Sequence, residues 1–313
     1  MKQLGKTDLS VSPVCLGTDW MGWSRTEADA FRVLDAFRDA GGNFLDTANV
    51  YGRWAGDGLN YSEICLGRWL VSRGLTGGSR PVIATKGAHY DLRDRRCRVT
   101  EADIRADVES SLKELGTDAL DLYYLHRDDP SLPPEEILSW LDALVGEGKL
   151  RYYAASNFSA ARLRAFAACA AENGSSGFAA VSNQHSLAQP NPGRNNNPDP
   201  TLVICGPDEL AFHRETGTPL IPFQSTARGY FAKRAAGLPV GPVLSAAFDN
   251  GQNEQTLRTL TQKSAESGLS VQTLTVTGLA ASADGYQLIP VVGVNSPERM
   301  RDVAAAMEIL KNN

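Results

Sequence analysis

Short apolar runs recur along the chain, and longer segments between them carry apolar residues three or four positions apart. The short runs are typical of buried β-strands, and the periodic segments are typical of helices that bury one face. Strands alternating with helices over 313 residues predict a single-domain α/β fold, a (β/α)8 TIM barrel. The eight strands are expected at residues 14–18, 43–46, 82–86, 122–126, 150–155, 179–184, 220–224 and 287–292.

Capping residues indicate where several helices begin. Thr26 precedes apolar positions at helical spacing and predicts a helix over residues 26–40. Thr100, which has Asp103 three positions later, and Ser159 are N-cap candidates for two more helices. The remaining helices are expected at residues 62–73, 134–145 and 296–310.

Two connections are longer than is usual between strands and helices. Residues 187–206 contain a run of asparagines, and residues 228–253 are rich in Gly, Ala and Pro. Both segments follow barrel strands, so both are expected as long loops at the carboxyl-terminal face of the barrel. Long loops in that position usually bind ligands.

Three of the expected strands end on side chains that can take part in chemistry. Asp46 ends the run FLD, Lys86 ends IATK, and His126 ends LYYLH. Tyr51 follows Asp46 within a short polar loop. Because the carboxyl ends of parallel barrel strands meet at one mouth, we expect all four side chains to converge there.

The landmarks FLDTANVYG, ATKG and YYLHRDDP, in this order, resemble those of the aldo-keto reductases. The resemblance runs from Leu4-Gly5-Lys6-Thr7 to the last helix. It implies a (β/α)8 barrel whose lower end is closed by a short β-hairpin at residues 1–12. It also implies an NAD(P)H-dependent oxidoreductase that converts an aldehyde or ketone to an alcohol. The catalytic residues implied are Asp46, Tyr51, Lys86 and His126.

These four residue types suit carbonyl reduction. Hydride addition builds negative charge on the carbonyl oxygen, so a proton donor is needed, and Tyr51 would supply the proton. The Lys86 ammonium would stabilise the tyrosinate and lower the pKa of Tyr51, while Asp46 would hold Lys86 in place. His126 would donate a hydrogen bond to the substrate oxygen.

No convincing G-x-G-x-x-G fingerprint opens a βαβ unit, so loops at the carboxyl face must hold the nucleotide. The resemblance favours NADP(H) over NAD(H), with Arg299 at the 2′-phosphate or the adenine. Ser182 in place of a glutamine, Val303 in place of an asparagine, and the lack of a basic residue at 293–296 depart from the family pattern and weaken that preference. The implied cofactor contacts are Gly17, Thr18, Asp46, Ser156, Asn157, Ser182, Gln184, Phe223, Gln224, Ser225, Thr226, Arg228, Gly293, Asn295 and Arg299.

Aromatic residues in the loops after the first strands are candidates for substrate contacts. Trp20 and Trp54, with Tyr51 and His126, would form a platform for a ring-shaped or sugar-like carbonyl compound. An equally good interpretation is that the tryptophans only pack loops together. His185 and the asparagines at 195–197 are further polar candidates.

Composition narrows the possible partners. The net charge of -5 and the lack of a basic tract argue against nucleic acid. No apolar run has transmembrane length, and the N-terminal residues lack the hydrophobic stretch of a signal peptide. Five scattered cysteines without a C-x-x-C pair favour reduced thiols and a cytoplasmic protein without a zinc site. We expect a monomer or small homo-oligomer that acts on a small molecule.

Two other functions are compatible with parts of the sequence. A metal-dependent barrel hydrolase would use His126, His185, Asp46 and Lys86, although the H-x-H of such sites is missing from the first strand. A non-catalytic nucleotide-binding subunit is the second, because relatives of this family serve as auxiliary redox sensors of ion channels. The complete set of four catalytic residue types argues against that second alternative.

Overall fold

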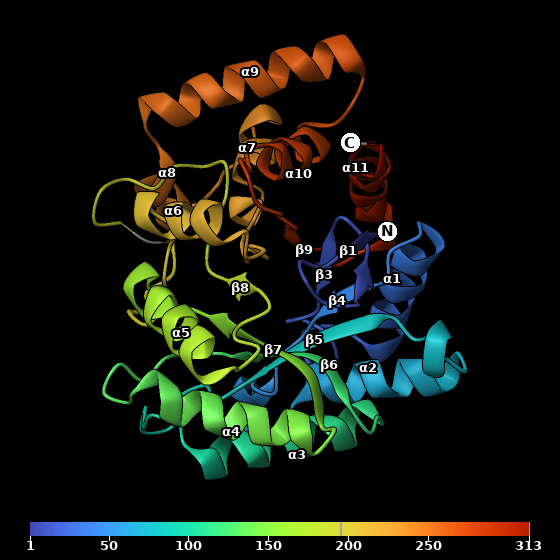
Figure 1. Cartoon of the computed structure of the whole chain (residues 1–313). Helices are drawn as coiled ribbons and strands as arrows, with labels where there is room; N and C mark the ends of the chain where they lie inside the picture. The colour runs from blue at the N-terminus through green and yellow to red at the C-terminus, as the bar shows by residue number, and fades with distance from the viewer. Residues whose placement is uncertain (195, 313) are drawn as a thin grey trace.

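The computed structural model describes residues 1–194 and 196–312. Within them, a seven-stranded sheet has the order β8-β7-β6-β5-β4-β3-β9, and every neighbouring pair of its strands is parallel (Figure 1). The strands are β3 (Cys15–Gly17), β4 (Phe44–Asp46), β5 (Val82–Gly87), β6 (Leu120–Leu125), β7 (Leu150–Ser156), β8 (Val181–Ser182) and β9 (Val291–Gly293).

A short extended segment closes the sheet into a barrel. Leu220 forms parallel bridges with Val181 on one side and with Leu288 on the other. Pro219 and Pro222 flank this segment, and proline has no N–H to donate to a ladder, which explains why the segment forms bridges instead of a continuous strand. The eight-stranded α/β barrel predicted from the sequence is therefore confirmed, and its seventh strand is the least regular.

The N-terminal segment forms the predicted hairpin at one end of the barrel. β1 (Lys2–Gln3) pairs antiparallel with β2 (Ser10–Val11). Leu4 and Leu9 are buried in the same apolar cluster as Phe44 and Ile221 of the barrel interior. The hairpin thus fills the amino-terminal end of the interior and leaves the carboxyl end for other side chains.

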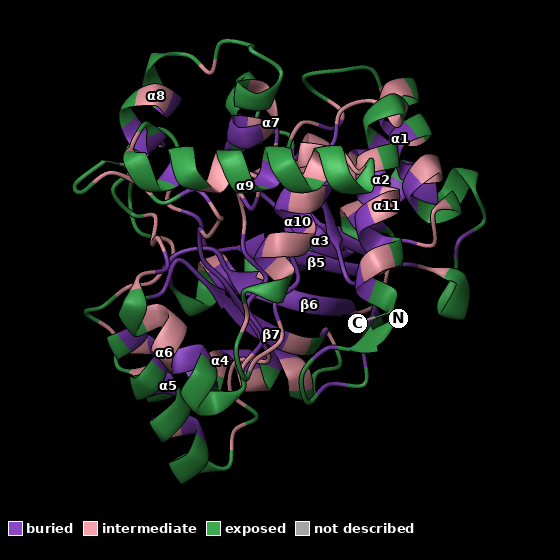
Figure 2. Ribbon diagram, turned by 90° about the horizontal axis from the view of Figure 1, so that it is seen from above, coloured by how far each residue is buried: buried purple, intermediate pink, exposed green. Residues whose placement is uncertain are grey.

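The helices surround the sheet and bury their inner faces, whereas their outer faces are exposed (Figure 2). The side chains of Thr26, Thr100 and Ser159 each accept a hydrogen bond from the backbone N–H three residues later, which confirms these three predicted N-caps. The longer helices are α1 (Glu27–Asp39), α2 (Tyr61–Ser72), α3 (Glu101–Leu115), α4 (Pro134–Gly146), α5 (Ala160–Asn173), α6 (Pro207–Thr216), α9 (Gly251–Ser267), α10 (Val271–Ala281) and α11 (Met300–Lys311).

The prediction of a long loop over residues 228–253 was wrong. This segment contains α7 (Tyr230–Ala235) and α8 (Pro242–Phe248). Tyr230 and Phe248 are buried in a separate apolar cluster, which stabilises helices too short to persist alone. Pro242, one of the prolines of this segment, stands at the first turn of α8, where a missing N–H costs nothing. In the other long connection, 187–206, the described residues include a bridge from Ile204 to Gln184.

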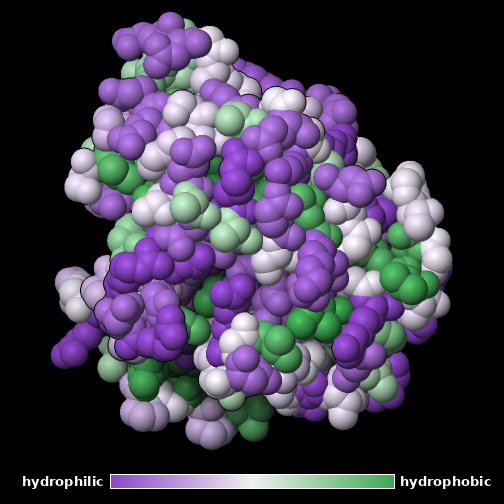
Figure 3. Space-filling model, turned by 90° about the horizontal axis from the view of Figure 1, so that it is seen from below, coloured by the Kyte–Doolittle hydropathy of each residue, from purple (hydrophilic) through white to green (hydrophobic). Residues whose placement is uncertain are grey.

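The surface in Figure 3 is mainly hydrophilic, and its hydrophobic residues form small separate groups. Helix α9 lies on the outside of the molecule (Figures 1 and 2). None of the helices within residues 1–194 and 196–312 combines the length and apolar character that crossing a membrane requires.

Candidate active site

Strand geometry carries the candidate catalytic side chains to the carboxyl mouth of the barrel. Side chains two positions apart on a strand point to the same face. Phe44 on β4 and Ala84 on β5 pack in the apolar barrel interior, and Asp46 and Lys86 follow them by two residues. His126 comes directly after β6, which is the other neighbour of β5. Asp46, Lys86 and His126 therefore lie together at the carboxyl mouth of the barrel, at the ends of three neighbouring strands.

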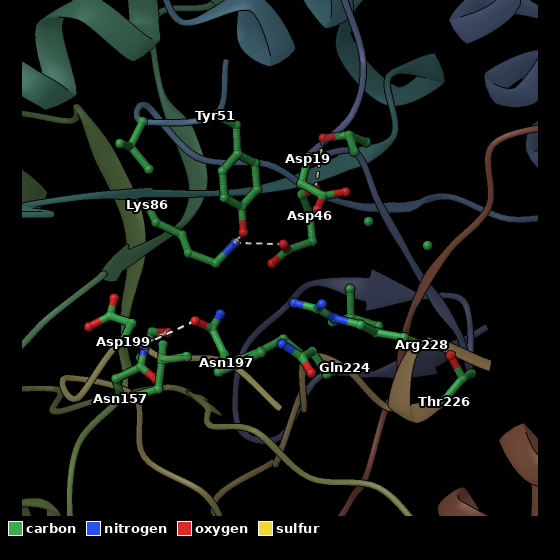
Figure 4. A pocket seen from close by; sticks show the side chains of 18 of the residues that line it. Asp19, Asp46, Tyr51, Lys86, Asn157, Asn197, Asp199, Gln224, Thr226 and Arg228 are labelled. Carbon is green, nitrogen blue, oxygen red and sulfur yellow. Dashed lines mark hydrogen bonds and ion pairs between the residues drawn. The ribbon is translucent and has the colours of Figure 1, made fainter. Parts of the chain in front are cut away.

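The Lys86 ammonium is the centre of this arrangement (Figure 4). Its Nζ donates to Asp46 Oδ1 at 2.5 Å, to the Thr47 carbonyl at 2.8 Å and to the Tyr51 hydroxyl at 3.2 Å. An ammonium has three protons, so each proton has one acceptor. Lys86 and Asp46 are both buried, with 2% and 3% of their surface exposed.

Burial by itself shifts the pKa values of Tyr51 and Lys86 in opposite directions. Burial is the largest single effect and would lower the pKa of Lys86, but the charge of Asp46, the Tyr51 oxygen and the hydrogen bonds to both groups together outweigh it, so the pKa of Lys86 is raised and the ammonium persists. Burial raises the pKa of Tyr51 to about 12, and the nearby ammonium offsets only part of that effect. The expectation that Lys86 brings the pKa of Tyr51 below its ordinary value was therefore wrong, because desolvation of the phenolate is the larger contribution.

His126 faces Tyr51 edge-on, with 6.0 Å between the two ring centroids. Burial, together with the adjacent Arg127, lowers the pKa of His126 well below 6.5, so its imidazole is neutral. Its Nδ1 is buried and has no hydrogen-bond partner among the described residues. A buried orphan N–H is rarer than a buried orphan acceptor, so the proton belongs on Nε2, and His126 is a hydrogen-bond donor.

A buried acidic residue ties together the segments that carry Lys86 and Tyr51. Glu63 of α2 accepts hydrogen bonds from the Thr85 hydroxyl at 2.5 Å and from the Asn49 amide at 3.3 Å. Thr85 immediately precedes Lys86, and Asn49 lies two residues before Tyr51. The Asn49 backbone N–H also donates to the Lys86 carbonyl at 2.9 Å. Glu63 therefore helps to set the distance between the ammonium and the phenol.

A cavity of about 1020 Å³ opens at this mouth. Such a volume is at the upper end of the range for ligand sites, about 300–1,000 Å³. Most of the residues named from the sequence line it together: Gly17, Thr18, Asp46, Tyr51, Trp54, Lys86, His126, Ser156, Asn157, Phe223, Gln224, Thr226, Arg228, Gly293 and Arg299.

Five of the expected cofactor and substrate contacts lie outside the cavity wall: Trp20, Ser182, Gln184, Ser225 and Asn295. Trp20 packs against the core between the sheet and the helices, and Ser182 is fully buried in β8. The Gln184 amide donates to the Asn196 side chain at 2.9 Å, and the Ser225 hydroxyl donates to the Val291 carbonyl at 2.5 Å. Asn295 is half-buried.

The remaining polar candidates, His185 and the asparagines at 195–197, divide in the same way. His185 lies outside the cavity wall, whereas Asn197 is part of it. Asn195 lies outside the described residues. In the described part of the chain, no three His, Cys, Asp or Glu side chains gather as a group that could hold a metal ion.

Comparison with known proteins assigns the family. The family model described as "Aldo/keto reductase family" matches residues 13–313. The chain belongs to the aldo/keto reductase family. The barrel and its carboxyl-face cavity are thus those of an aldo/keto reductase.

Three curated relatives illustrate the similarity. The chain is 37% identical to "Uncharacterized oxidoreductase YrpG" of Bacillus subtilis over 50% of this chain and 48% of that protein. It is 36% identical to "6-dehydroglucose reductase" of Novosphingobium aromaticivorans over 50% of this chain and 51% of that protein. It is 34% identical to "Aryl-alcohol dehydrogenase [NADP(+)]" of Phanerodontia chrysosporium over 48% and 41%. In these alignments the chain spans about half the length of the curated relatives it matches.

Sequence reasoning missed several residues that line the cavity of this aldo/keto reductase. Asp19 follows Thr18 after β3 and lies beside Asp46 in Figure 4; the strand-end pattern that found Asp46 would have found it too. Asp199 also lines the cavity, and it accepts hydrogen bonds from Tyr90 at 2.9 Å and from Arg127 at 2.9 Å. No local pattern signals Asp199, because its partners are far away in the sequence.

Removing the Glu63 carboxylate should destabilise the protein. Glu63→Ala leaves buried hydroxyl and amide donors without their acceptor, so we expect the free energy of unfolding to fall by about 3 kcal/mol or more, measured by urea denaturation. Glu172→Ala on the exposed side of α5 is the matched control and should unfold like the parent protein. A Glu63→Ala protein with the parent's urea midpoint would contradict the supporting role of Glu63.

Proposed function

We propose that this aldo/keto reductase reduces an aldehyde or ketone to an alcohol with NAD(P)H as the hydride donor. The observation that carries the proposal is the buried Lys86 ammonium, which is shared between Asp46 and the Tyr51 hydroxyl at the wall of a large cavity. The names of two relatives, a 6-dehydroglucose reductase and an NADP(+) aryl-alcohol dehydrogenase, support the same class of reaction.

The residues along the cavity suit a dinucleotide. Phe223 offers a flat apolar face, and the polar residues Ser156 and Asn157 line the same cavity. Arg228 points into the cavity from the side opposite Asp46 (Figure 4). Among the described residues, the side chains of Arg228, Lys233 and Arg299 form no ion pair, so their charges are available to phosphate groups. When bound, the nicotinamide cofactor supplies the hydride.

The chain's own residues transfer the proton and stabilise the negative charge that develops on the substrate oxygen. Tyr51 gives its hydroxyl proton to the oxygen that becomes the alcohol. His126 donates from Nε2 to the same oxygen and holds the carbonyl in place while negative charge builds. Lys86 stabilises the tyrosinate that remains, and Asp46 keeps Lys86 charged and oriented.

The proposal favours NADP(H) over NAD(H). Arg299, with Lys233 and Arg228, gives the cavity three cationic side chains suited to a 2′-phosphate. Asp302 lies in the same wall and opposes them, although its carboxylate accepts a hydrogen bond from Ser270 at 2.7 Å. We also propose that the protein acts in the cytoplasm, as a monomer or small homo-oligomer, on a small carbonyl or alcohol substrate such as a sugar derivative.

Replacing the proposed acid should separate binding from turnover. Tyr51→Phe is expected to keep NADPH affinity, followed by nicotinamide fluorescence, and to lower kcat by a factor of about 10² to 10⁴ for a panel of aldehydes and ketones. Tyr152→Phe is the matched control, because the Tyr152 hydroxyl contacts Asp8 of the N-terminal hairpin outside the cavity. A Tyr51→Phe enzyme as fast as the parent would remove Tyr51 as the acid.

The pH dependence of the two directions should differ. With the pKa of Tyr51 at about 12 and the pKa of His126 far below neutrality, neither group changes protonation between about pH 6 and pH 9. The kcat/KM for reduction is therefore expected to stay flat over that range. Alcohol oxidation needs the phenolate as base, so its kcat/KM should rise with pH throughout. A reduction rate that falls through about pH 8 would contradict these protonation states.

Removing one cation should alter cofactor preference. Arg299→Ala is expected to weaken NADPH binding about tenfold and to leave NADH binding nearly unchanged, since only NADPH carries the 2′-phosphate. Arg301→Ala, an equal change of charge two residues later in α11 but outside the cavity wall, is the control. Equal losses for both cofactors in Arg299→Ala would argue against a 2′-phosphate contact.

A further inference from the structure

His89 is a second histidine at the mouth of the barrel, and it has no place in the roles proposed above. It follows β5 by two residues, lines the cavity, and has only 8% of its surface exposed. Its ring lies edge-on to His126, with 4.8 Å between the ring centroids. Any substrate whose carbonyl oxygen contacts His126 therefore places its neighbouring atoms near His89.

The position of the His89 proton follows from its backbone contact. His89 Nδ1 lies 3.0 Å from the carbonyl oxygen of Tyr90. A carbonyl oxygen only accepts hydrogen bonds, so Nδ1 carries the proton. Burial, reinforced by the positive charge of Arg127, lowers the pKa of His89 to about 4. The ring is therefore neutral near pH 7, and its Nε2 is an acceptor without a proton.

The two histidines consequently present opposite hydrogen-bonding groups. His126 offers an Nε2–H donor, and His89 offers a bare Nε2 acceptor that makes no hydrogen bond with any described residue. A plain aldehyde or ketone has only an acceptor oxygen and satisfies His126 alone. A carbonyl compound with a hydroxyl on the adjacent carbon has an acceptor and a donor on neighbouring atoms, so it satisfies both histidines.

We propose that His89 is a specificity-determining residue, whose Nε2 accepts a hydrogen bond from a hydroxyl next to the substrate carbonyl. The preferred substrates of this site are then 2-hydroxyaldehydes and hydroxyketones, including sugar-derived ones. This inference rests on the proposed carbonyl reductase function and specifies the substrate class of the same cavity. His89 lines the cavity, so a bound substrate that lacks the hydroxyl takes the place of water at its Nε2 and leaves this acceptor without a donor, which is how a polar site rejects such analogues.

The test compares two aldehydes that differ by one hydroxyl, 2-hydroxypropanal and propanal. The ratio of their kcat/KM values is measured with NADPH for the parent enzyme, His89→Phe, His89→Ala and His89→Gln. Differences in hydration between the two aldehydes cancel when this ratio is compared between enzymes. The parent is expected to favour 2-hydroxypropanal, and the ratio should fall about tenfold in His89→Phe and His89→Ala, with propanal turnover changing less. His89→Gln retains an acceptor oxygen and should keep part of the preference.

Each outcome has one meaning. A ratio that stays the same in His89→Phe and His89→Ala overturns the inference and leaves the proposed function intact. A parent protein that binds NADPH but reduces no carbonyl compound overturns the proposed function, and the inference with it. An equal loss of activity toward both aldehydes in all three variants assigns His89 to general support of the site and also overturns the inference.

Discussion

The buried ion pair between Lys86 and Asp46 is the interaction on which the rest of the site depends. A lysine removed from water is unfavourable unless its charge is paired and its protons are bonded. Here the sheet order puts β4 beside β5, so the carboxylate and the ammonium meet at 2.5 Å. The remaining protons go to the Thr47 carbonyl and the Tyr51 hydroxyl. The ion pair therefore fixes the position of the Tyr51 hydroxyl as well as the charge of Lys86.

The same burial that requires this pairing keeps the proton on Tyr51. Lys86 favours the tyrosinate, yet desolvation is stronger and leaves the phenol protonated until about pH 12. In the proposed reaction, the acid is thus always ready for reduction, and the ammonium becomes important only as negative charge appears on the phenol oxygen. His126, neutral for the same reason of burial, complements this arrangement as a donor that does not change its charge.

Features that depend on local sequence were predicted well, and features that depend on distant contacts were not. Apolar runs ending on Asp46, Lys86 and His126 located the strands and the mouth, because strand alternation and sheet order then determine where those side chains point. The helices within 228–253 were missed, since their stability comes from packing of residues such as Tyr230 and Phe248 against distant elements. The sign of the pKa change at Tyr51 depends on a balance between burial and charge that a sequence does not reveal.

The most direct test of this account is the ionisation of Tyr51 itself. The absorbance of phenolate is titrated in the parent protein and in Tyr51→Phe, and the difference between the two curves belongs to Tyr51. Tyr51 is buried, and Lys86 is paired with Asp46. We therefore expect the two titration curves to coincide up to about pH 10, because the pKa of Tyr51 is about 12. A phenolate that appears in the difference curve near about pH 8 would contradict it.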